Sequence, residues 1–329
     1  MKNFQYAPAR DAKQAVALLS TDWEQSRIMG GGTDLLDEMK ERLVETERIV
    51  HLQPAAFGYI RNTRQHIVIG ATTTIAALET NPLIEQKLPG LRQAASSIAT
   101  PQIRNAATVG GNLCQRPRCW YYRNIEYPCL KKGGSTCYAK EGANKYNAII
   151  GGGPSYIVHP SDCAPMLMAF GASVRIAGPK GERVVPLDSF FVLPRKDVMR
   201  ENILEPNEVI TEILVPQPAA GSTSTYLKFK ERETQDFALA SAAVALTSRN
   251  GVVQSARVVL GGVAPIPWRS AEAEELVKGK RLTPEVAQAA AIAALKPAKP
   301  LDDNEYKVPL AQTIVRRALL AAAVAKPTS

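Results

Sequence analysis

A run of three glycines between a short apolar segment and a segment of helical periodicity constrains this chain more than any other feature. Residues 26–42 read "SRIMGGGTDLLDEMKER". Glycine can adopt positive φ and lets backbone N–H groups approach an anion closely. The run therefore predicts either a loop that binds a pyrophosphate group or only a tight turn from strand to helix. Its spacing is not the G-x-G-x-x-G of a dinucleotide-binding βαβ unit, so a nicotinamide-binding fold is disfavoured.

A second glycine segment repeats this chemistry further along the chain, where residues 104–113 read "RNAATVGGNL". Thr108 and Asn112 flank Gly110 and Gly111, and they add a hydroxyl and an amide that can bond a ribityl chain or a phosphate. Two such loops in neighbouring domains would hold one long cofactor from both ends.

Apolar periodicity and turn residues divide the chain into three regions. Residues 1–55 are predicted to form a small α/β unit, with a helix over 11–20 and strands over 26–29 and 46–52. Residues 56–218 predict an α+β domain, in which strand-like segments are separated by glycine and proline turns. These segments include residues 156–159, 172–178 and 182–187, with a hairpin at "GPKG", residues 178–181.

A stretch rich in Pro, Ala, Gly, Ser and Thr, "PQPAAGSTST" over residues 216–225, is predicted to be a linker. The third region, residues 224–329, contains strand-like segments followed by alanine-rich helices. We expect Thr283 to cap one of these helices, with Pro284 as its first residue.

Composition limits the classes of protein to which this chain can belong. A chain of 329 residues, 45% hydrophobic, is long enough for two or three domains with cores of their own. No secretory signal and no run of about 18 apolar residues is found, so no membrane insertion is expected. The net charge of +9 would suit an acidic partner. However, Lys and Arg are spread along the chain rather than blocked, which disfavours nucleic-acid binding.

Four of the five cysteines lie in the segment 114–137, and the fifth follows soon after it; they are Cys114, Cys119, Cys129, Cys137 and Cys163. A disulfide framework is disfavoured in a large chain without a secretory signal. Zinc sites usually pair cysteines at C-x₂₋₄-C spacing, which only the first interval approaches. An iron–sulfur cluster tolerates wider, uneven spacing, and the neighbouring basic residues would offset its charge. Free buried thiols are the remaining alternative.

The order of motifs resembles the FAD-binding (medium) subunit of the molybdenum hydroxylases, the xanthine dehydrogenase and aldehyde oxidoreductase family. These motifs are "GGGTDLL", "RNAATVGGN", "HPSD", "YLKFKER…DFALASAAV" and "VVLGGVAPIPWR", and they span nearly the whole chain. The aldehyde oxidoreductase type that carries an iron–sulfur loop is the most similar within the family. The resemblance implies an α+β fold: a two-subdomain FAD-binding fold (PCMH-type), then a smaller α/β C-terminal domain of the CO dehydrogenase flavoprotein type.

The resemblance also implies which residues bind FAD. Asp162 in "HPSD" matches a flavin-contacting aspartate, although it could equally cap a helix. Lys228 matches a lysine at the cofactor, with an exposed strand lysine as the alternative. Ile98 stands where some relatives have an aromatic residue, so it offers no stacking. The full set of expected cofactor-binding residues is Met29, Gly30, Gly31, Gly32, Thr33, Asp34, Leu35, Ile98, Thr108, Val109, Gly110, Gly111, Asn112, Asp162, Ile210 and Lys228.

For the cysteines, the resemblance implies a [4Fe-4S] cluster held by Cys119, Cys129 and Cys137. Relatives have their fourth cysteine just before "HPSD", where this sequence has Tyr156. The fourth ligand is then Cys114, Cys163 or the Tyr156 phenolate, or else the cluster is labile or absent.

The activity that the resemblance implies is that of an electron-transfer oxidoreductase subunit in a heterotrimer. A large subunit with the molybdenum cofactor would hydroxylate the substrate, and a small subunit with two [2Fe-2S] clusters would relay electrons to FAD for an external acceptor. We expect a cytoplasmic complex, or a periplasmic one exported on a partner's signal. The alternatives are a stand-alone flavin oxidoreductase and a zinc-stabilised binding module.

Overall fold

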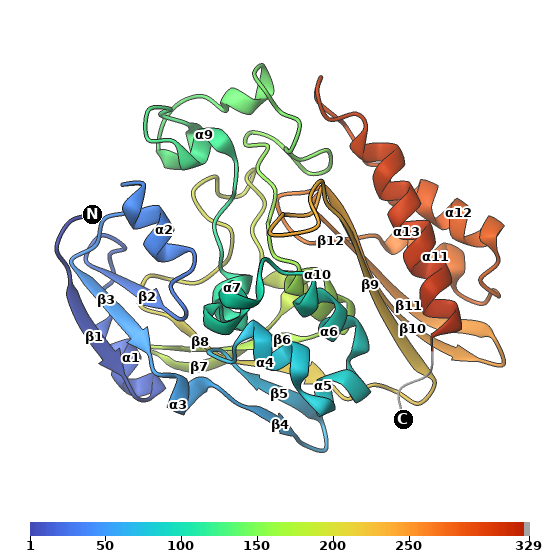
Figure 1. Cartoon of the computed structure of the whole chain (residues 1–329), viewed down its shortest axis with the longest axis horizontal. Helices are drawn as coiled ribbons and strands as arrows, with labels where there is room; N and C mark the ends of the chain where they lie inside the picture. The colour runs from blue at the N-terminus through green and yellow to red at the C-terminus, as the bar shows by residue number, and fades with distance from the viewer. Residues whose placement is uncertain (326–329) are drawn as a thin grey trace.

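The computed structural model describes residues 1–325, whose strands form three sheets (Figure 1). The first is parallel, in the order β1-β3-β2, with bounds Gln5–Ala9, Arg48–Leu52 and Ser26–Met29. The second is antiparallel, in the order β4-β5-β8-β6-β7, with bounds Ile60–Asn62, His66–Gly70, Val209–Pro216, Ser173–Gly178 and Gly181–Pro186. The third is antiparallel, in the order β12-β11-β10-β9, with bounds Trp268–Arg269, Val252–Gly261, Ala240–Arg249 and Ser222–Phe229.

Short helices connect the strands of the first two regions. Helix α1, Ala12–Leu18, is capped by Asp11, and helix α2, Leu35–Lys40, begins shortly after the glycine run. The helices of the middle region are α3 Pro54–Phe57, α4 Ile75–Thr80, α5 Pro82–Lys87, α6 Pro89–Ser96, α7 Pro101–Ala106, α8 Val109–Leu113, α9 Trp120–Arg123 and α10 Cys163–Ala169. Three 3₁₀ turns accompany them: Leu130–Lys132, Tyr138–Lys140 and Leu187–Ser189.

The third sheet is covered on both faces, which joins the C-terminal region to the rest of the molecule. One face carries α11 Ala271–Val277, α12 Pro284–Ala294 and α13 Lys307–Val324, in an alanine- and valine-rich core. The other face packs on α6 and α10, and every residue of α10 is buried. Helices α6 and α10 therefore lie packed between the middle region and the C-terminal sheet.

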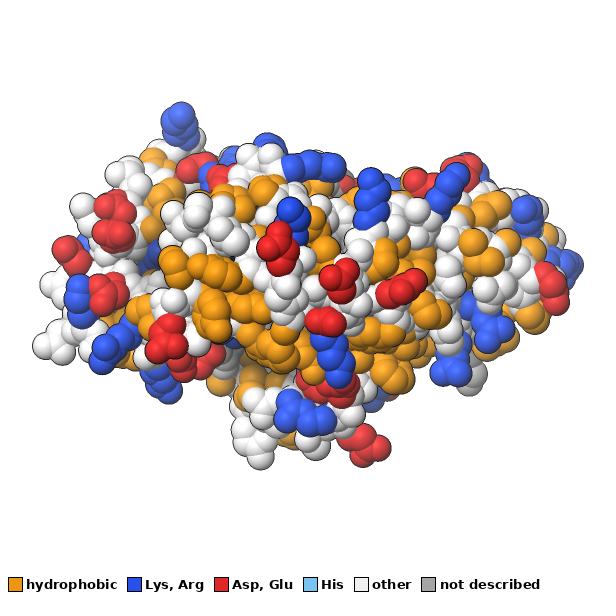
Figure 2. All heavy atoms as spheres, turned by 90° about the horizontal axis from the view of Figure 1, so that it is seen from above, with side chains coloured by type: hydrophobic (Ala, Val, Ile, Leu, Met, Phe, Trp, Pro, Cys, Tyr) orange, Lys and Arg blue, Asp and Glu red, His pale blue; other side chains and the backbone are white. Residues whose placement is uncertain are grey.

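The segment from the first to the fourth loop cysteine, residues 114–137, projects as an irregular loop around α9 at the top of Figure 1. We call it the cysteine loop. It lies on the face seen from above in Figure 2, where hydrophobic side chains lie across the middle among scattered charged ones. Its exposed large hydrophobic side chains are Trp120, Ile125 and Tyr127.

The α+β class and most of the expected elements are confirmed. Thr283 accepts a hydrogen bond from the backbone N–H of Val286, and Pro284 is the first residue of α12, as expected. The strand expected over residues 156–159 is wrong, because this segment bonds to two separate loops instead of to a strand ladder. The linker is shorter than expected, since β9 begins at Ser222 and buries Thr223, Ser224 and Thr225.

Candidate functional site

The two glycine segments touch each other, although one follows strand β2 and the other runs from helix α7 into helix α8. A Cβ atom on Gly30 would lie 2.5 Å from Oγ1 of Thr108, and one on Gly31 would lie 1.8 Å from the backbone oxygen of Ala106. Gly32 has φ +73°, a conformation that other residues rarely adopt. The glycines are therefore required for close packing of two backbones, in addition to any ligand.

A cavity of 340 Å³ opens beside these two loops, and we call it the glycine-loop cavity. Two of its buried polar atoms, Nε of Arg27 and Oγ1 of Thr72, have neither a hydrogen-bond nor an ion-pair partner among residues 1–325. Such orphaned atoms suit a polar ligand. Most of the predicted cofactor-binding residues line the cavity, namely Met29, Gly30, Gly31, Gly32, Thr33, Asp34, Leu35, Thr108, Gly110, Gly111 and Ile210.

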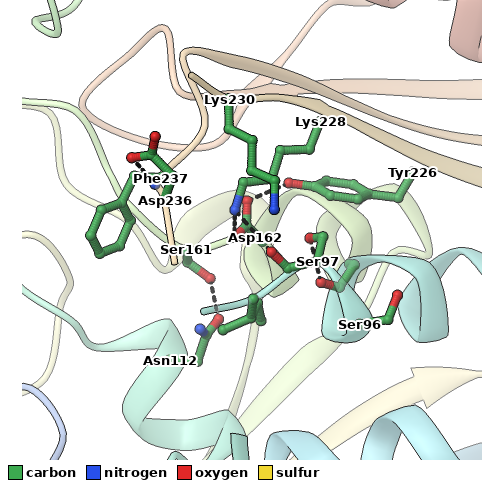
Figure 3. Close-up of polar contacts among 12 residues, drawn as sticks. Ser96, Ser97, Asn112, Ser161, Asp162, Tyr226, Lys228, Lys230, Asp236 and Phe237 are labelled. Atoms are coloured by element: carbon green, nitrogen blue, oxygen red, sulfur yellow. Dashed lines mark hydrogen bonds and ion pairs between the residues drawn. The ribbon is translucent and has the colours of Figure 1, made fainter. Parts of the chain in front are cut away.

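A second cavity, of 290 Å³, is the Asp162 cavity, which lies between the middle region and the C-terminal sheet. Its walls include His159, Ser161 and Asp162 from one side and Phe237 and Leu239 from the other. Ser161 donates to Oδ1 of Asn112 at 2.5 Å, so Asn112 links the second glycine segment to this cavity (Figure 3). The two cavities thus lie on either side of one buried contact.

Asp162 is held by two side chains of β9 (Figure 3). The hydroxyl of Tyr226 donates to Oδ1 at 2.6 Å, and Nζ of Lys228 lies 2.7 Å from Oδ2. The ammonium also donates to the backbone oxygen of Ser97 at 3.2 Å. Lys228 is therefore not an exposed strand lysine, because its side chain is only 3% exposed.

The capping alternative for Asp162 fails, because its side chain makes no cap bond to α10. The hydroxyl of Ser161 accepts from the backbone N–H of Ala164 and fills that role. Burial, followed by the negative charge of Asp162, raises the pKa of Tyr226 well above its usual value, so Tyr226 is a hydrogen donor at neutral pH. Tyr226 is not among the residues predicted from the sequence, but its position two residues from Lys228 on a strand places both side chains on one face.

Some predicted residues lie outside both cavities. Ile98 and Val109 are buried in the core of the middle region, at 8% and 0% exposure. Lys228 reaches the Asp162 cavity only through the carboxylate of Asp162. These residues can support the site, but their side chains do not line it.

Within the cysteine loop, the Cys137 thiol lies within electrostatic range of both Cys119 and Cys129. Burial raises the pKa of Cys119 and of Cys129, and the Cys137 thiol adds to both shifts. The amide of Asn147 lies 3.7 Å from Sγ of Cys119. Nevertheless, among residues 1–325 no group of three His, Cys, Asp or Glu side chains is arranged to hold a metal ion.

The two other cysteines lie elsewhere. Cys114 lines the glycine-loop cavity, and burial raises its pKa to about 12. Cys163 is fully buried at the start of α10, where burial raises its pKa. Tyr156, in contrast, lines a surface cavity together with Cys137, and its backbone oxygen accepts from the same Asn147 amide that contacts Cys119.

Comparison with known proteins identifies the family and the fold. Residues 2–218 match the family described as "FAD binding domain in molybdopterin dehydrogenase", and residues 224–322 match the "CO dehydrogenase flavoprotein C-terminal domain". The chain belongs to this family of FAD-binding subunits of molybdenum hydroxylases, as its motifs predicted.

Individual relatives match over almost their full length. The chain is 32% identical to the carbon monoxide dehydrogenase medium chain of Hydrogenophaga pseudoflava, covering 97% of this chain and 96% of the relative. It is 33% identical to the aldehyde oxidoreductase FAD-binding subunit of Escherichia coli K12, covering 95% and 96%. A solved carbon monoxide dehydrogenase structure from Hydrogenophaga pseudoflava superposes with a TM-score of 0.78 at 31% identity, covering 98% of this chain and 97% of that one.

The residues of the two cavities fit FAD. Backbone N–H groups beside Gly30 and Gly31 suit a diphosphate, and the orphaned atoms of Arg27 and Thr72 add a cation and a hydroxyl beside it. The Asp162 cavity adds a buried carboxylate, together with Nε2 of His159, which has no partner among the described residues. Burial lowers the pKa of His159 to about 4, so its ring is neutral at neutral pH.

Proposed function

We propose that the chain is the FAD-binding electron-transfer subunit of a molybdenum hydroxylase complex. It takes electrons from the iron–sulfur centres of a partner subunit and passes them through FAD to an external acceptor. The observation that carries this proposal is the pair of cavities on either side of the Asn112 to Ser161 contact, within a chain of an FAD-binding family. Two subunits complete the complex, a large one with the molybdenum cofactor and a small one with two [2Fe-2S] clusters.

In this proposal the protein binds, orients and shields the cofactor, while FAD supplies the redox chemistry. The glycine run and the second glycine segment hold the diphosphate in the glycine-loop cavity. The carboxylate of Asp162, fixed by Tyr226 and Lys228, presents a negative charge at the flavin end. No general base is required of the protein, because it performs no proton abstraction from a substrate.

The test is the cofactor content of the purified full chain, with flavin, iron, acid-labile sulfide and zinc assayed in one sample. One FAD per chain, released on denaturation and not replaced by FMN, is the expected result. A folded chain that contains zinc and has no affinity for FAD would support the zinc-stabilised module instead. Turnover of a substrate by the isolated chain would favour the stand-alone flavin oxidoreductase.

We also propose that the cysteine loop holds a [4Fe-4S] cluster with Cys119, Cys129 and Cys137 as ligands. Two observations support it: the electrostatic effect of Cys137 on the pKa values of Cys119 and Cys129, and the cationic Lys132 near Cys129. Tyr156 is the best-placed group for the fourth position, since it lines a cavity with Cys137, whereas Cys114 lines the glycine-loop cavity and Cys163 is buried at the start of α10. Small movements of an irregular loop would be needed to close the ligand set.

Single substitutions, compared by the amount of bound iron, distinguish the proposed cluster ligands from the other cysteines. We expect Cys137→Ser to lose most of the bound iron, whereas the matched control Cys163→Ser keeps it. We expect Tyr156→Cys to slow the loss of iron to a chelator, because a fourth thiolate replaces a weaker ligand. Wild-type protein without iron after anaerobic purification, with FAD present, would show that the loop does not hold a cluster.

The expected cellular compartment follows from the chemistry of the thiols and the cluster. Free thiols and an oxygen-sensitive cluster favour assembly in the cytoplasm, and export on a partner's signal would place the finished complex in the periplasm. Among residues 1–325 no helix has the length and hydropathy to cross a membrane.

A further inference from the structure

Asp34 stands two positions after the last residue of the glycine run, but the partners of its carboxylate come from the cysteine loop. Oδ2 accepts from the backbone N–H of Arg116 at 2.7 Å. Oδ1 lies 2.8 Å from Nη1 of Arg118 and 2.7 Å from Nη2 of Arg123. The Asp34 side chain is only 16% exposed, so these contacts are partly shielded from solvent.

A second contact lies one turn further along α2. The hydroxyl of Tyr122 donates to Oε1 of Glu38 at 2.6 Å, and both side chains are buried. Burial raises the pKa of both groups, so the Tyr122 hydroxyl keeps its proton and remains the donor in this contact. Residues 116–123 therefore meet residues 34–38 at two separate points.

Arg123 also makes hydrogen bonds within the first part of the cysteine loop, residues 116–123. Its Nε donates to the backbone oxygen of Pro117 at 2.7 Å, and its Nη2 donates to that of Arg116 at 3.2 Å. Cys119 lies within the segment 116–123 that these hydrogen bonds stabilise. Arg123 lines neither the glycine-loop cavity nor the Asp162 cavity, so its action on either one passes through Asp34 and the loop backbone.

We propose that Asp34 is a positioning residue that ties the cysteine loop to the glycine run, so that FAD binding and the order of the cysteine loop around Cys119 stabilise each other. This inference rests on the proposed function. Two sites joined by one set of contacts share a coupling free energy, and the coupling is reciprocal. FAD held by the glycine run would order the cysteine loop, and an ordered loop would raise the affinity for FAD.

The test uses the full chain, freed of flavin and titrated with FAD while protein fluorescence is followed. We expect Asp34→Asn and Arg123→Gln each to weaken FAD binding by about 5- to 150-fold, the range usual for coupled sites. Asp37→Asn is the matched control, because Asp37 is on the same helix, is 55% exposed, and lies 3.7 Å from Arg118 and 3.8 Å from Arg123. Its affinity for FAD should stay within about twofold of wild type.

A second readout follows the loop itself. The rate at which a thiol reagent labels Cys119 is measured by mass spectrometry, with and without saturating FAD. FAD should slow labelling of the wild type, and Arg123→Gln should remove most of that protection while remaining folded by circular dichroism.

The outcomes separate this inference from the proposed function. Wild-type FAD affinity in Arg123→Gln, together with a loss in Asp34→Asn, would mean that Asp34 acts on FAD directly, and it would overturn the coupling. A labelling rate of Cys119 that is the same with and without FAD in the wild type would also overturn the coupling. A wild-type chain that binds no FAD would instead contradict the proposed function.

Discussion

At the residue scale, one buried carboxylate organises the Asp162 cavity. Asp162 is 5% exposed, and both of its oxygens are engaged, one by a phenol and one by an ammonium group. A buried charge is tolerated only when it is paired and hydrogen-bonded. The cation therefore stabilises the folded chain as well as shaping the site.

Replacing Lys228 with Met should destabilise the protein by about 3 kcal/mol, because Asp162 is then left as a buried charge with a single neutral donor. The measurement is urea unfolding of the flavin-free full chain. Lys180→Met is the control, since Lys180 is exposed in the β6–β7 hairpin. A change below 0.5 kcal/mol in Lys228→Met would contradict the stabilising role of the pair.

At the element scale, the segment before α10 is held by separate bonds rather than by a sheet. The backbone N–H of His159 donates to the oxygen of Ala264, and its ring packs edge-on to Phe191 at 4.8 Å between ring centroids. The ring is fully enclosed, and burial lowers its pKa to about 4. The segment thus contains a titratable group that the fold keeps neutral.

This predicts a loss of stability in mild acid. The pKa of His159 in the folded chain lies below its unfolded value of 6.5, so the unfolded state binds the extra proton as the pH falls. We expect the free energy of unfolding to drop by about 2 kcal/mol between pH 7 and pH 5 from this group. In His159→Asn that part of the drop should vanish. An unchanged pH dependence in the variant would rule out His159 as its source.

At the scale of the whole molecule, the two cavities draw residues from all three regions of the chain. The glycine-loop cavity combines residues near the first sheet with residues of the middle region, and the Asp162 cavity combines the middle region with the C-terminal region. A ligand that occupied both would connect all three. We propose that the three units are residues 1–55, 56–218 and 224–329.

FAD should therefore stabilise the whole chain and not one domain. At a free concentration of 100 times its Kd, FAD should add about 2.7 kcal/mol to the free energy of unfolding. Calorimetry should show all thermal transitions moving upward together. A shift confined to one transition, with the others unmoved, would mean that the ligand contacts a single domain.

Much of the candidate site could be predicted from the sequence because its signals are local. The glycine run, the TVGGN segment and the helix cap at Thr283 can each be recognised from a few consecutive residues, and the glycine-loop cavity forms where the first two of these segments meet. Ile98 and Val109 were expected at the cofactor, but the tertiary packing buries them in the core. Residues 156–159 are apolar enough for a strand, yet no strand within residues 1–325 pairs with them.

The sequence by itself determined the backbone conformations that only glycine allows, the strand and helix periods, and the family order of the motifs. Only the tertiary structure decided that Asp34 faces three arginines of the cysteine loop and that Tyr226 joins Lys228 at Asp162. The physical reason is sequence distance. These partners lie 64 to 89 positions apart along the chain, so no local pattern specifies them, and they meet only when the sheets and helices pack.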